Sequence, residues 1–282
     1  MTGSEERAHP RRAPESEPTT TPGAQVVGRV AAVLQAVATT EHGGSTAGIA
    51  RRTGLTRPTA HRLLSALVHE GMLDRTPAGE WVLGFELTIL GAVAAQRYPA
   101  QDLATPHLHM LAEATGESAF FSARRGDEVI CLERAEGSFP VRSHVLHEGL
   151  RLPLGVASAG LAILGHLPED QIEAALAATR QRRAELGTQH DDAHVRRLVG
   201  HVREHGWSLN PGRIVEGSWG MAAAVFDASG QPRYALSLTG IESRFRPARQ
   251  RQLGAALLDQ AHRLSTALRT GQATSPGPSV GR

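Results

Sequence analysis

The chain has 282 residues, of which 40% are hydrophobic, and its formal net charge is only +2. This length accommodates two domains. No uncharged apolar run reaches the roughly 20 residues that a membrane-spanning helix needs, and the N-terminus lacks a secretion-signal pattern. A single cysteine, Cys131, excludes an internal disulfide. We therefore expect a cytoplasmic, reducing location and no membrane partner.

All 30 basic residues of the chain are arginine. Because this bias extends over the whole sequence, arginine richness alone is weak evidence for a nucleic-acid partner. Places where arginines are segregated from acidic residues are better evidence. The absence of lysine also excludes covalent chemistry that depends on a lysine amine.

Composition and hydrophobic periodicity divide the chain into five segments. The tail at 1–24 is rich in Pro, Ser, Thr and Glu, and the tail at 271–282 (GQATSPGPSVGR) looks equally unstructured, so both are predicted to be disordered. Between them we expect a first domain at 25–84, a linker helix at 85–98, and a second domain at 99–270.

The first domain shows the order of a winged helix-turn-helix. Residues 26–38 have apolar side chains at helical spacing. Thr46 can cap a second helix, Gly54 suits a left-handed helix end, and Thr56 can cap a third helix that tolerates Pro58 in its first turn. Segments 73–75 and 80–83 flank a Thr-Pro-Ala-Gly turn, which predicts the β-hairpin wing.

Charge placement in this domain favours binding to double-stranded DNA. From Ser45 to His69 every charged residue is an arginine, and the first acid is Glu70. Arginine side chains can read guanine in the major groove, and hydroxyl groups at a helix N-terminus can contact phosphates. The predicted DNA-facing residues are Arg51, Arg52, Thr56, Arg57, Thr59, His61, Arg62, Ser65 and Arg75.

The second domain reads as strands interleaved with helices, which predicts an α+β fold with helices packed on one sheet. The expected helices are residues 85–97, 102–115, 157–164, 168–178, a helix capped by Asp191 or Asp192 that runs to about residue 204, and 247–268. The expected strands are residues 119–122, 128–133, 141–146, 221–226 and 234–238.

Several motifs in order resemble the IclR family of bacterial transcription factors. They are the helix-turn-helix at 49–64, Gly149–Leu154 followed by Ala157–Gly160, Met221–Asp227, and Ala235–Gly240. The resemblance runs from about residue 25 to 268. It implies a GAF-like effector domain with an antiparallel sheet flanked by helices, homodimers or homotetramers, and a palindromic operator controlled by a small metabolite.

By motif position, the resemblance also implies which residues face the effector. They are Val141, His144, Ser158, Ala159, Asn210, Gly220, Ser237 and Thr239, to which Trp219 is added because it can narrow or roof the pocket. The chain departs from the family at Leu161 and in the segment 217–220. Free N–H groups at a helix start favour an anion, so we expect a small organic or aromatic acid as the effector.

Other interpretations of the residues are weaker. His194, His201 and His205 share one helix face but lack the partners of a zinc site, and Cys131 in an apolar strand reads as a buried structural thiol. We therefore expect no metal and no cofactor. An enzyme built on the second domain remains an alternative, although the chain has no nucleophile elbow, P-loop or dinucleotide fingerprint. A module that binds a protein partner is the other alternative.

Overall fold

The computed structural model describes residues 22–40, 43–95, 100–141 and 145–271. The chain divides into two compact units at the boundary between residues 97 and 98. Each unit has a hydrophobic core of its own. Most of the two tails predicted to be disordered, and the predicted pocket residue His144, lie outside the described residues.

The first unit is a winged helix-turn-helix, as the sequence predicts. Its core packs Ile49, Leu64 and Trp81 together with smaller side chains of the first helix. Its elements are α1 (Pro22–Ala38), α2 (Thr46–Thr53), α3 (Arg57–His69), β1 (Leu73–Arg75), β2 (Trp81–Leu83) and α4 (Phe85–Ala95). Helix α1 therefore begins at Pro22, inside the segment assigned to the tail, since proline is well tolerated in a first helical turn.

Helix caps fix the geometry of the helix-turn-helix. Gly54 ends α2 in the left-handed conformation with φ of 65°, and the Thr56 side chain caps α3, as predicted. The prediction for the start of α2 is wrong by one residue: the Ser45 hydroxyl accepts the N–H of Gly48 at 3.2 Å. Thr46 instead uses its hydroxyl to accept a hydrogen bond from the indole N–H of Trp81 at 2.9 Å.

The second unit is built on one antiparallel sheet of six strands in the order β5-β4-β3-β8-β7-β6. The strands are β3 (Ser118–Arg125), β4 (Glu128–Ala135), β5 (Arg151–Pro153), β6 (Trp207–Pro211), β7 (Ser218–Phe226) and β8 (Pro232–Ile241). The helices are α5 (Ala100–Thr115), α6 (Ser158–Gly165), α7 (Glu169–Glu185), α8 (Asp192–His205) and α9 (Pro247–Thr270), with short 3-10 turns η1 (Thr188–His190) and η2 (Glu242–Arg244).

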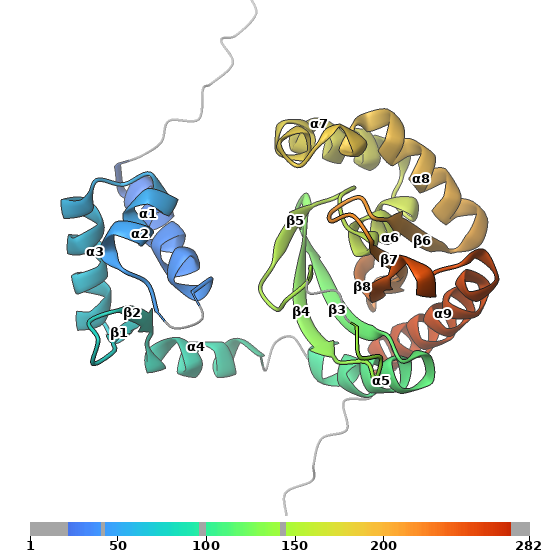
Figure 1. Cartoon of the computed structure of the whole chain (residues 1–282), viewed down its shortest axis with the longest axis horizontal. Coiled ribbons are helices and arrows are strands. Elements are labelled where there is room, and N and C mark those ends of the chain that lie inside the picture. Colours follow the sequence, from blue (N-terminus) through green and yellow to red (C-terminus); the bar gives the residue numbers. More distant parts are fainter. Residues whose placement is uncertain (1–21, 41–42, 96–99, 142–144, 272–282) are drawn as a thin grey trace, which may run out of the picture. The chain divides into compact units, whose positions relative to one another are not determined.

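Helices cover both faces of this sheet (Figure 1). Along β7, Met221, Ala223 and Val225 face the larger core under α5 and α9. Because side chains alternate along a strand, Gly220 and Ala222 face the opposite side, where α6 packs. A second core joins α6 to α7 and α8. The fold is α+β, as expected.

One strand prediction is wrong, and two strands were not predicted. The described residues of 141–146 form no strand; Leu146 instead turns inward against Phe120 and Cys131. The place beside β4 is taken by β5, in which Pro153 pairs with Glu128, and the sequence interpretation missed it. It also missed β6, which pairs along β7 from Trp207 to Pro211. Both are short, and β6 mixes polar residues with proline, so neither has a clear alternating pattern.

Candidate nucleic-acid interface and ligand pocket

Helix α3 turns one face to the core and the opposite face to solvent. Ala60, Leu64 and Leu67 are buried, whereas Arg57, His61, Arg62 and Ser65 are exposed. At 100° per residue, Arg62 lies about 160° around the helix from Leu64. The helix therefore presents a continuous basic and polar strip to solvent, and it carries no acidic residue between Arg57 and His69.

The other predicted DNA-facing residues are partly engaged within the unit. Arg52 donates to the Thr39 hydroxyl at 2.8 Å and to the Ala36 carbonyl at 3.3 Å, which ties α2 to α1. Arg75 donates to the Gly79 carbonyl at 2.8 Å and stacks 4.5 Å from the centre of the Trp81 ring. The hydroxyls of Thr56 and Thr59 lie 2.9 Å apart. These contacts fix both helices and the wing.

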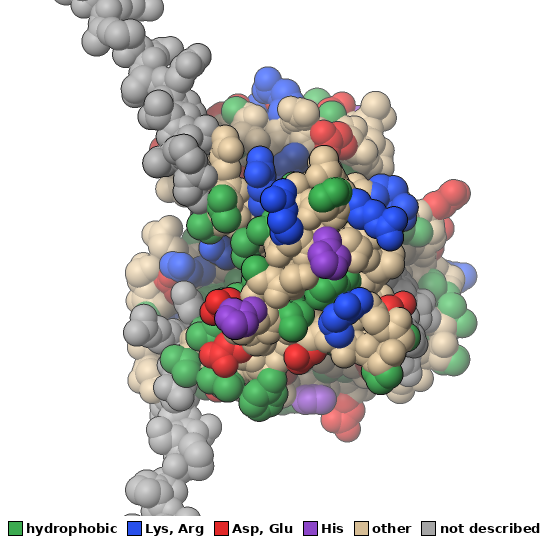
Figure 2. Space-filling model, turned by 90° about the vertical axis from the view of Figure 1, so that its left-hand side faces the viewer, with side chains coloured by type: hydrophobic (Ala, Val, Ile, Leu, Met, Phe, Trp, Pro, Cys, Tyr) green, Lys and Arg blue, Asp and Glu red, His purple; other side chains and the backbone are tan. Residues whose placement is uncertain are grey.

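Figure 2 views the molecule from the side of this unit. Arginine and histidine side chains are spread over the middle of the face, and most acidic side chains lie toward its margins, at the upper right as well as below. No ion pair is found among the described side chains of residues 22–95. The arginines of this face are therefore not neutralised by acids of their own unit and remain available to an anionic partner.

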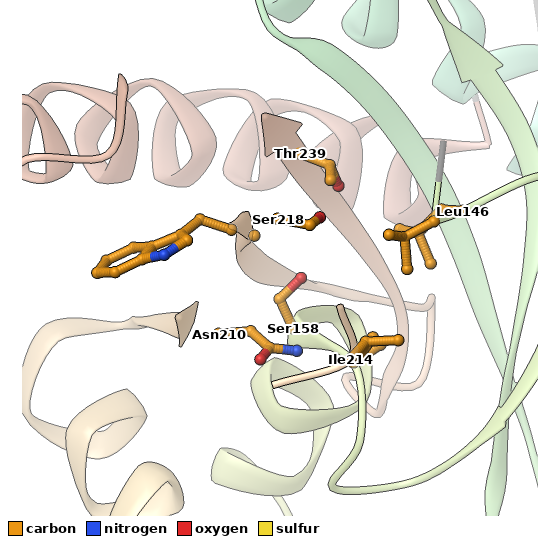
Figure 3. A pocket seen from close by; sticks show the side chains of 10 residues that line it. Leu146, Ser158, Asn210, Ile214, Ser218 and Thr239 are labelled. Atoms are coloured by element: carbon orange, nitrogen blue, oxygen red, sulfur yellow. The ribbon is translucent and has the colours of Figure 1, made fainter. Parts of the chain in front are cut away.

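A small cavity of the second unit lies where β6, β7 and β8 meet the start of α6. Its volume is about 20 Å³, room for about one water molecule. Figure 3 shows Leu146 and Ile214 along one side of it and Ser158, Asn210 and Ser218 across from them. Its lining residues are Val145, Leu146, Ala157, Ser158, Asn210, Ile214, Ser218, Trp219, Gly220 and Thr239.

The polar groups around this cavity are poorly satisfied. Asn210 Oδ1, Thr239 Oγ1 and the neighbouring Ser237 Oγ are buried and have no hydrogen-bond partner among the described residues. Helix α6 begins after Ala157 with no side chain capping its first turn. Buried polar atoms in native proteins are normally paired, so this concentration of unpaired donors and acceptors marks a place for a polar ligand.

Strand β6 holds the start of α6 in position. The Ser208 hydroxyl donates to the Ser158 carbonyl at 2.8 Å, and the Asn210 amide nitrogen donates to the Val156 carbonyl at 2.9 Å. Because the nitrogen of Asn210 faces a carbonyl, its Oδ1 remains as an acceptor. These bonds leave the first N–H groups of α6 oriented beside the cavity.

The structure brings five of the predicted effector residues to the cavity wall: Ser158, Asn210, Trp219, Gly220 and Thr239. Ala159 is buried in the second core, and Val141 is exposed. Ser237 is buried on β8 two residues before Thr239, where it pairs with Ala222 of β7. Trp219 packs against the larger core, on the side of β7 away from α6. Its indole therefore does not occupy the α6 side of the sheet.

Sequence reasoning missed much of the apolar wall, namely Val145, Leu146 and Ile214. The apolar pattern of 141–146 was visible in the sequence, but it was interpreted as a strand. Ile214 lies in the connection between β6 and β7, where an isolated apolar residue gives no periodic signal. Only the fold places these side chains beside Ser158.

A buried polar cluster lies next to Ile214 of the cavity wall. Arg213, next to Ile214, donates to the Gln189 carbonyl, and the Gln189 side chain donates back to the Arg213 carbonyl at 2.9 Å. Burial and the nearby charges of Arg213 and Arg183 lower the pKa of His190 to about 4, so this imidazole is neutral at pH 7.

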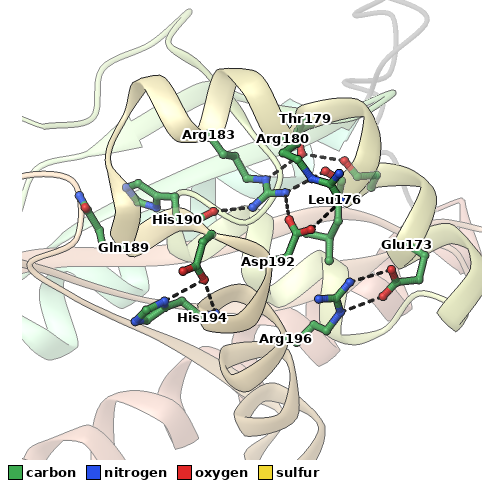
Figure 4. Close-up of polar contacts among 12 residues, drawn as sticks. Glu173, Leu176, Thr179, Arg180, Arg183, Gln189, His190, Asp192, His194 and Arg196 are labelled. Atoms are coloured by element: carbon green, nitrogen blue, oxygen red, sulfur yellow. Dashed lines mark hydrogen bonds and ion pairs between the residues drawn. The ribbon is translucent and has the colours of Figure 1, made fainter.

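Arg183 connects the same cluster to α7 and α8. Its guanidinium donates to the Thr179 hydroxyl, to the Leu176 and His190 carbonyls, and to Asp192, as the dashed lines of Figure 4 show. Asp191 accepts the N–H of His194 at 2.8 Å and caps α8, which decides between the two predicted caps.

The remaining candidate groups are structural. His201 stacks on His205 at 4.2 Å and meets Trp207 edge-on at 4.7 Å. Among the described residues no group of three or more His, Cys, Asp or Glu side chains could hold a metal ion. Burial raises the pKa of the Cys131 thiol to about 12, with a smaller contribution from Glu148, so the thiol stays protonated and unreactive.

Comparison with known families identifies both units. The model of the IclR helix-turn-helix domain matches residues 26–77, and that of the bacterial transcriptional regulator IclR C-terminal domain matches residues 93–266. The chain belongs to the IclR family. It is accordingly a DNA-binding transcriptional regulator with an effector-binding domain, and family members of this kind are not generally enzymes.

Individual relatives agree with this assignment. The transcriptional repressor AllR of Salmonella typhimurium is 29% identical over 255 residues, which cover 90% of this chain and 93% of AllR. The crystal structure of an IclR homolog from Microbacterium hydrocarbonoxydans, complexed with 4-hydroxybenzoate, has a TM-score of 0.72 and 26% identity, with 86% of this chain and 99% of that chain covered. The Thermotoga maritima IclR structure matches the fold, with a TM-score of 0.67, 20% identity and coverage of 87% and 99%.

The described helices include none that is both long enough and apolar enough to cross a membrane.

Proposed function

We propose that α3 enters the DNA major groove and reads an operator through its exposed strip. The acid-free outer face of α3 carries this proposal, because His61, Arg62 and Ser65 point away from the core of the unit and Arg57 is exposed at the start of the helix. Arginine in this position can make bidentate contacts to guanine, each worth about 1–3 kcal/mol of base discrimination. Arg62, at the middle of the strip, is the residue on which we expect specificity to depend most.

The flanking residues would hold the DNA backbone. Thr56 and Thr59 stand at the N-terminus of α3, where hydroxyl and N–H groups suit phosphate oxygens. Arg75 is fixed on the wing by the Gly79 carbonyl and the Trp81 ring, so it reaches DNA with little loss of side-chain freedom. Arg51 and Arg52 on α2 would brace the helix pair against the backbone.

The cavity beside α6 would bind the effector, a small organic or aromatic acid. Its polar side offers hydroxyl groups and helix N–H groups, which stabilise a carboxylate. The 4-hydroxybenzoate bound to the Microbacterium homolog is a molecule of this class. Effector-binding residues would be Ser158, Ala159, Asn210, Gly220, Ser237 and Thr239, with Trp219, Val141 and His144 at the margins.

We further propose that the protein acts as a homodimer or homotetramer on a palindromic site. Helix α4 supports this, because Phe85, Ile89, Leu90 and Val93 leave apolar side chains exposed on a helix without a polar face. A second copy could cover them. Two recognition helices would then read half-sites about 34 Å apart.

The cavity supports regulation and not catalysis. Its described lining residues include no carboxylate, histidine or cysteine that could act as base or nucleophile. A cytoplasmic location would suit a protein that works on DNA.

Footprinting tests this proposal directly. The purified full chain should protect a discrete palindromic site upstream of its own or an adjacent gene, at nanomolar concentration and near-physiological salt. Uniform binding to any DNA, with no protected site, would contradict it. Turnover of a small acid by the purified protein would favour the enzyme interpretation.

A further inference from the structure

Two turns at one end of the six-stranded sheet bring arginines together. Arg124 and Arg125 stand just before the turn between β3 and β4, and Arg233 stands just after the turn between β7 and β8. Strands β3 and β8 pair antiparallel as far as Ala123 and Tyr234, so continuing this register places Arg124 opposite Arg233. Like charges in this arrangement destabilise a sheet. An anion bound beside the pair would remove that cost.

A hollow of about 350 Å³ lies between the two turns. Arg124 is half-buried and donates its Nε–H to the Gly126 carbonyl at 2.9 Å, which orients its guanidinium, whereas Arg125 and Arg233 are exposed. Small-molecule sites typically measure about 300–1,000 Å³. The hollow therefore has the size of a ligand site and carries three positive charges. Its described lining has no acidic side chain and consists of Arg124, Arg125, Gly126, Gln231, Pro232 and Arg233.

Two acids close to the hollow are engaged by other groups. The Glu128 carboxylate pairs with Arg182 at 2.6 Å and with Arg151 at 3.6 Å. The Asp227 carboxylate interacts electrostatically with Arg233, but it accepts two backbone N–H groups and a hydroxyl of its own turn. Among the described side chains, the three arginines of the hollow form no ion pair. They are therefore free to bind an anion from solution.

Three guanidinium groups in one hollow suit an anion with more than one charge. Phosphate oxygens accept guanidinium N–H donors in pairs, and two linked phosphates can meet all three side chains. We propose that this hollow binds a small molecule carrying a diphosphate group. The Gln231 amide and the Pro232 ring then contact the remainder of that molecule. The site shares no residue with the cavity beside α6 or with α3, so it is a second ligand site beyond the proposed function.

Other anions fit this hollow less well. A monocarboxylate neutralises only one of the three charges, and citrate spreads its charges along a carbon chain where a diphosphate has them on two adjacent centres. Duplex DNA presents a convex surface, which reaches the exposed Arg125 and Arg233 more easily than the half-buried Arg124.

Calorimetry on the full chain tests the class of ligand with four probes at equal ionic strength: pyrophosphate, inorganic phosphate, citrate and acetate. Pyrophosphate should bind roughly tenfold or more tightly than each of the others. Arg125→Gln should weaken pyrophosphate about tenfold, because it removes charge-assisted hydrogen bonds. The matched control is Arg251→Gln, which removes the same charge from an exposed position on α9 and should bind pyrophosphate as wild type does.

The absence of lysine from the chain allows the site to be located directly. Arg125→Lys introduces the only lysine side chain, which keeps a positive charge at the hollow. Pyrophosphate should protect this amine from an acylating reagent, as measured by peptide mass spectrometry. In Arg251→Lys the introduced amine should react equally with and without pyrophosphate. Because this measurement reads one position, arginines of the first unit that also attract anions do not affect it.

Several results would overturn the proposal: citrate or acetate binding as tightly as pyrophosphate, unchanged pyrophosphate affinity in Arg125→Gln, or equal protection of the amines introduced at positions 125 and 251. A short DNA duplex of unrelated sequence is added in a parallel labelling reaction. Protection of the Arg125→Lys amine by the duplex and not by pyrophosphate would make DNA the occupant and would overturn the proposal as well.

Discussion

The two units present their functional side chains in opposite ways. The first unit exposes it: His61, Arg62 and Ser65 lie on the outer face of a single helix, without acidic neighbours on that helix. The second unit encloses it, and Ser158, Asn210 and Thr239 come from three separated segments to one buried cavity. A large anion such as DNA can be met by one convex helix, whereas a small ligand needs a wall on every side.

The largest effect we expect is a loss of stability in the first unit alone. Trp81→Ala removes a side chain that is 2% exposed and bonds to Thr46, and such core truncations cost about 3–5 kcal/mol. The first unit should unfold and DNA binding should be lost, while thermal denaturation still shows the transition of the second unit. Trp81→Phe, which keeps an aromatic ring, should lose much less stability. Full operator binding by Trp81→Ala would show that the wing is not part of this core.

The second effect concerns recognition alone. Arg62→Ala should lower operator affinity about 10- to 100-fold, because one bidentate base contact is worth about 1–3 kcal/mol. Its melting temperature should not change, since Arg62 is exposed. The matched control is Arg251→Ala, which removes the same charge from an exposed position in the second unit. Equal operator affinity for the two variants would exclude Arg62 from the interface.

The third effect is a pH dependence confined to the second unit. His190 is buried and its folded-state pKa is about 4, against 6.5 unperturbed, because of burial and the charges of Arg213 and Arg183. Its stabilising contribution is therefore complete above pH 6.5 and declines as the pH falls toward 4. Urea denaturation should show a loss of roughly 1 kcal/mol between pH 6.5 and 5.5, because half of the unfolded-state imidazole is already protonated at pH 6.5. His190→Gln should flatten that slope, and an unchanged slope would assign it to other groups.

The smallest effect tests whether the unpaired hydroxyl serves a ligand. Thr239→Val keeps the shape and removes a hydroxyl that has no partner among the described residues. Stability without ligand should be kept or rise slightly, whereas benzoate affinity should fall about fivefold, equivalent to about 1 kcal/mol for one hydrogen bond. Thr239→Ser, which retains a hydroxyl, should bind benzoate nearly as wild type does. A loss of stability in Thr239→Val without loss of affinity would mark the hydroxyl as structural.

The same contrast explains what the sequence could predict. In the first unit Gly54, Thr56 and the α3 strip are local signals, since a cap or a helix face depends on residues a few positions apart. Both the fold class of the second unit and its family motifs were also predictable. Its pocket was only partly so, because Ile214 meets Ser158 through β6 and β7, and no periodicity in the sequence encodes that pairing.

Two positions in the second unit show the same limit. The 141–146 segment has the apolar pattern of a strand, but β5 occupies the edge of β4 that it would need. Trp219 lines the cavity, but the alternation of β7 packs its indole against the core under α9. In both cases the decisive information is which strand lies beside which, and that is set by long-range packing.

The most direct test of the account joins the two units in one measurement. Operator affinity of the full chain should be measured by fluorescence anisotropy at fixed salt, with and without saturating benzoate. The account predicts that the bound acid changes operator affinity tenfold or more, and that Thr239→Val weakens this response while keeping operator affinity without ligand. Saturation of the cavity by benzoate with no change in operator affinity would contradict it.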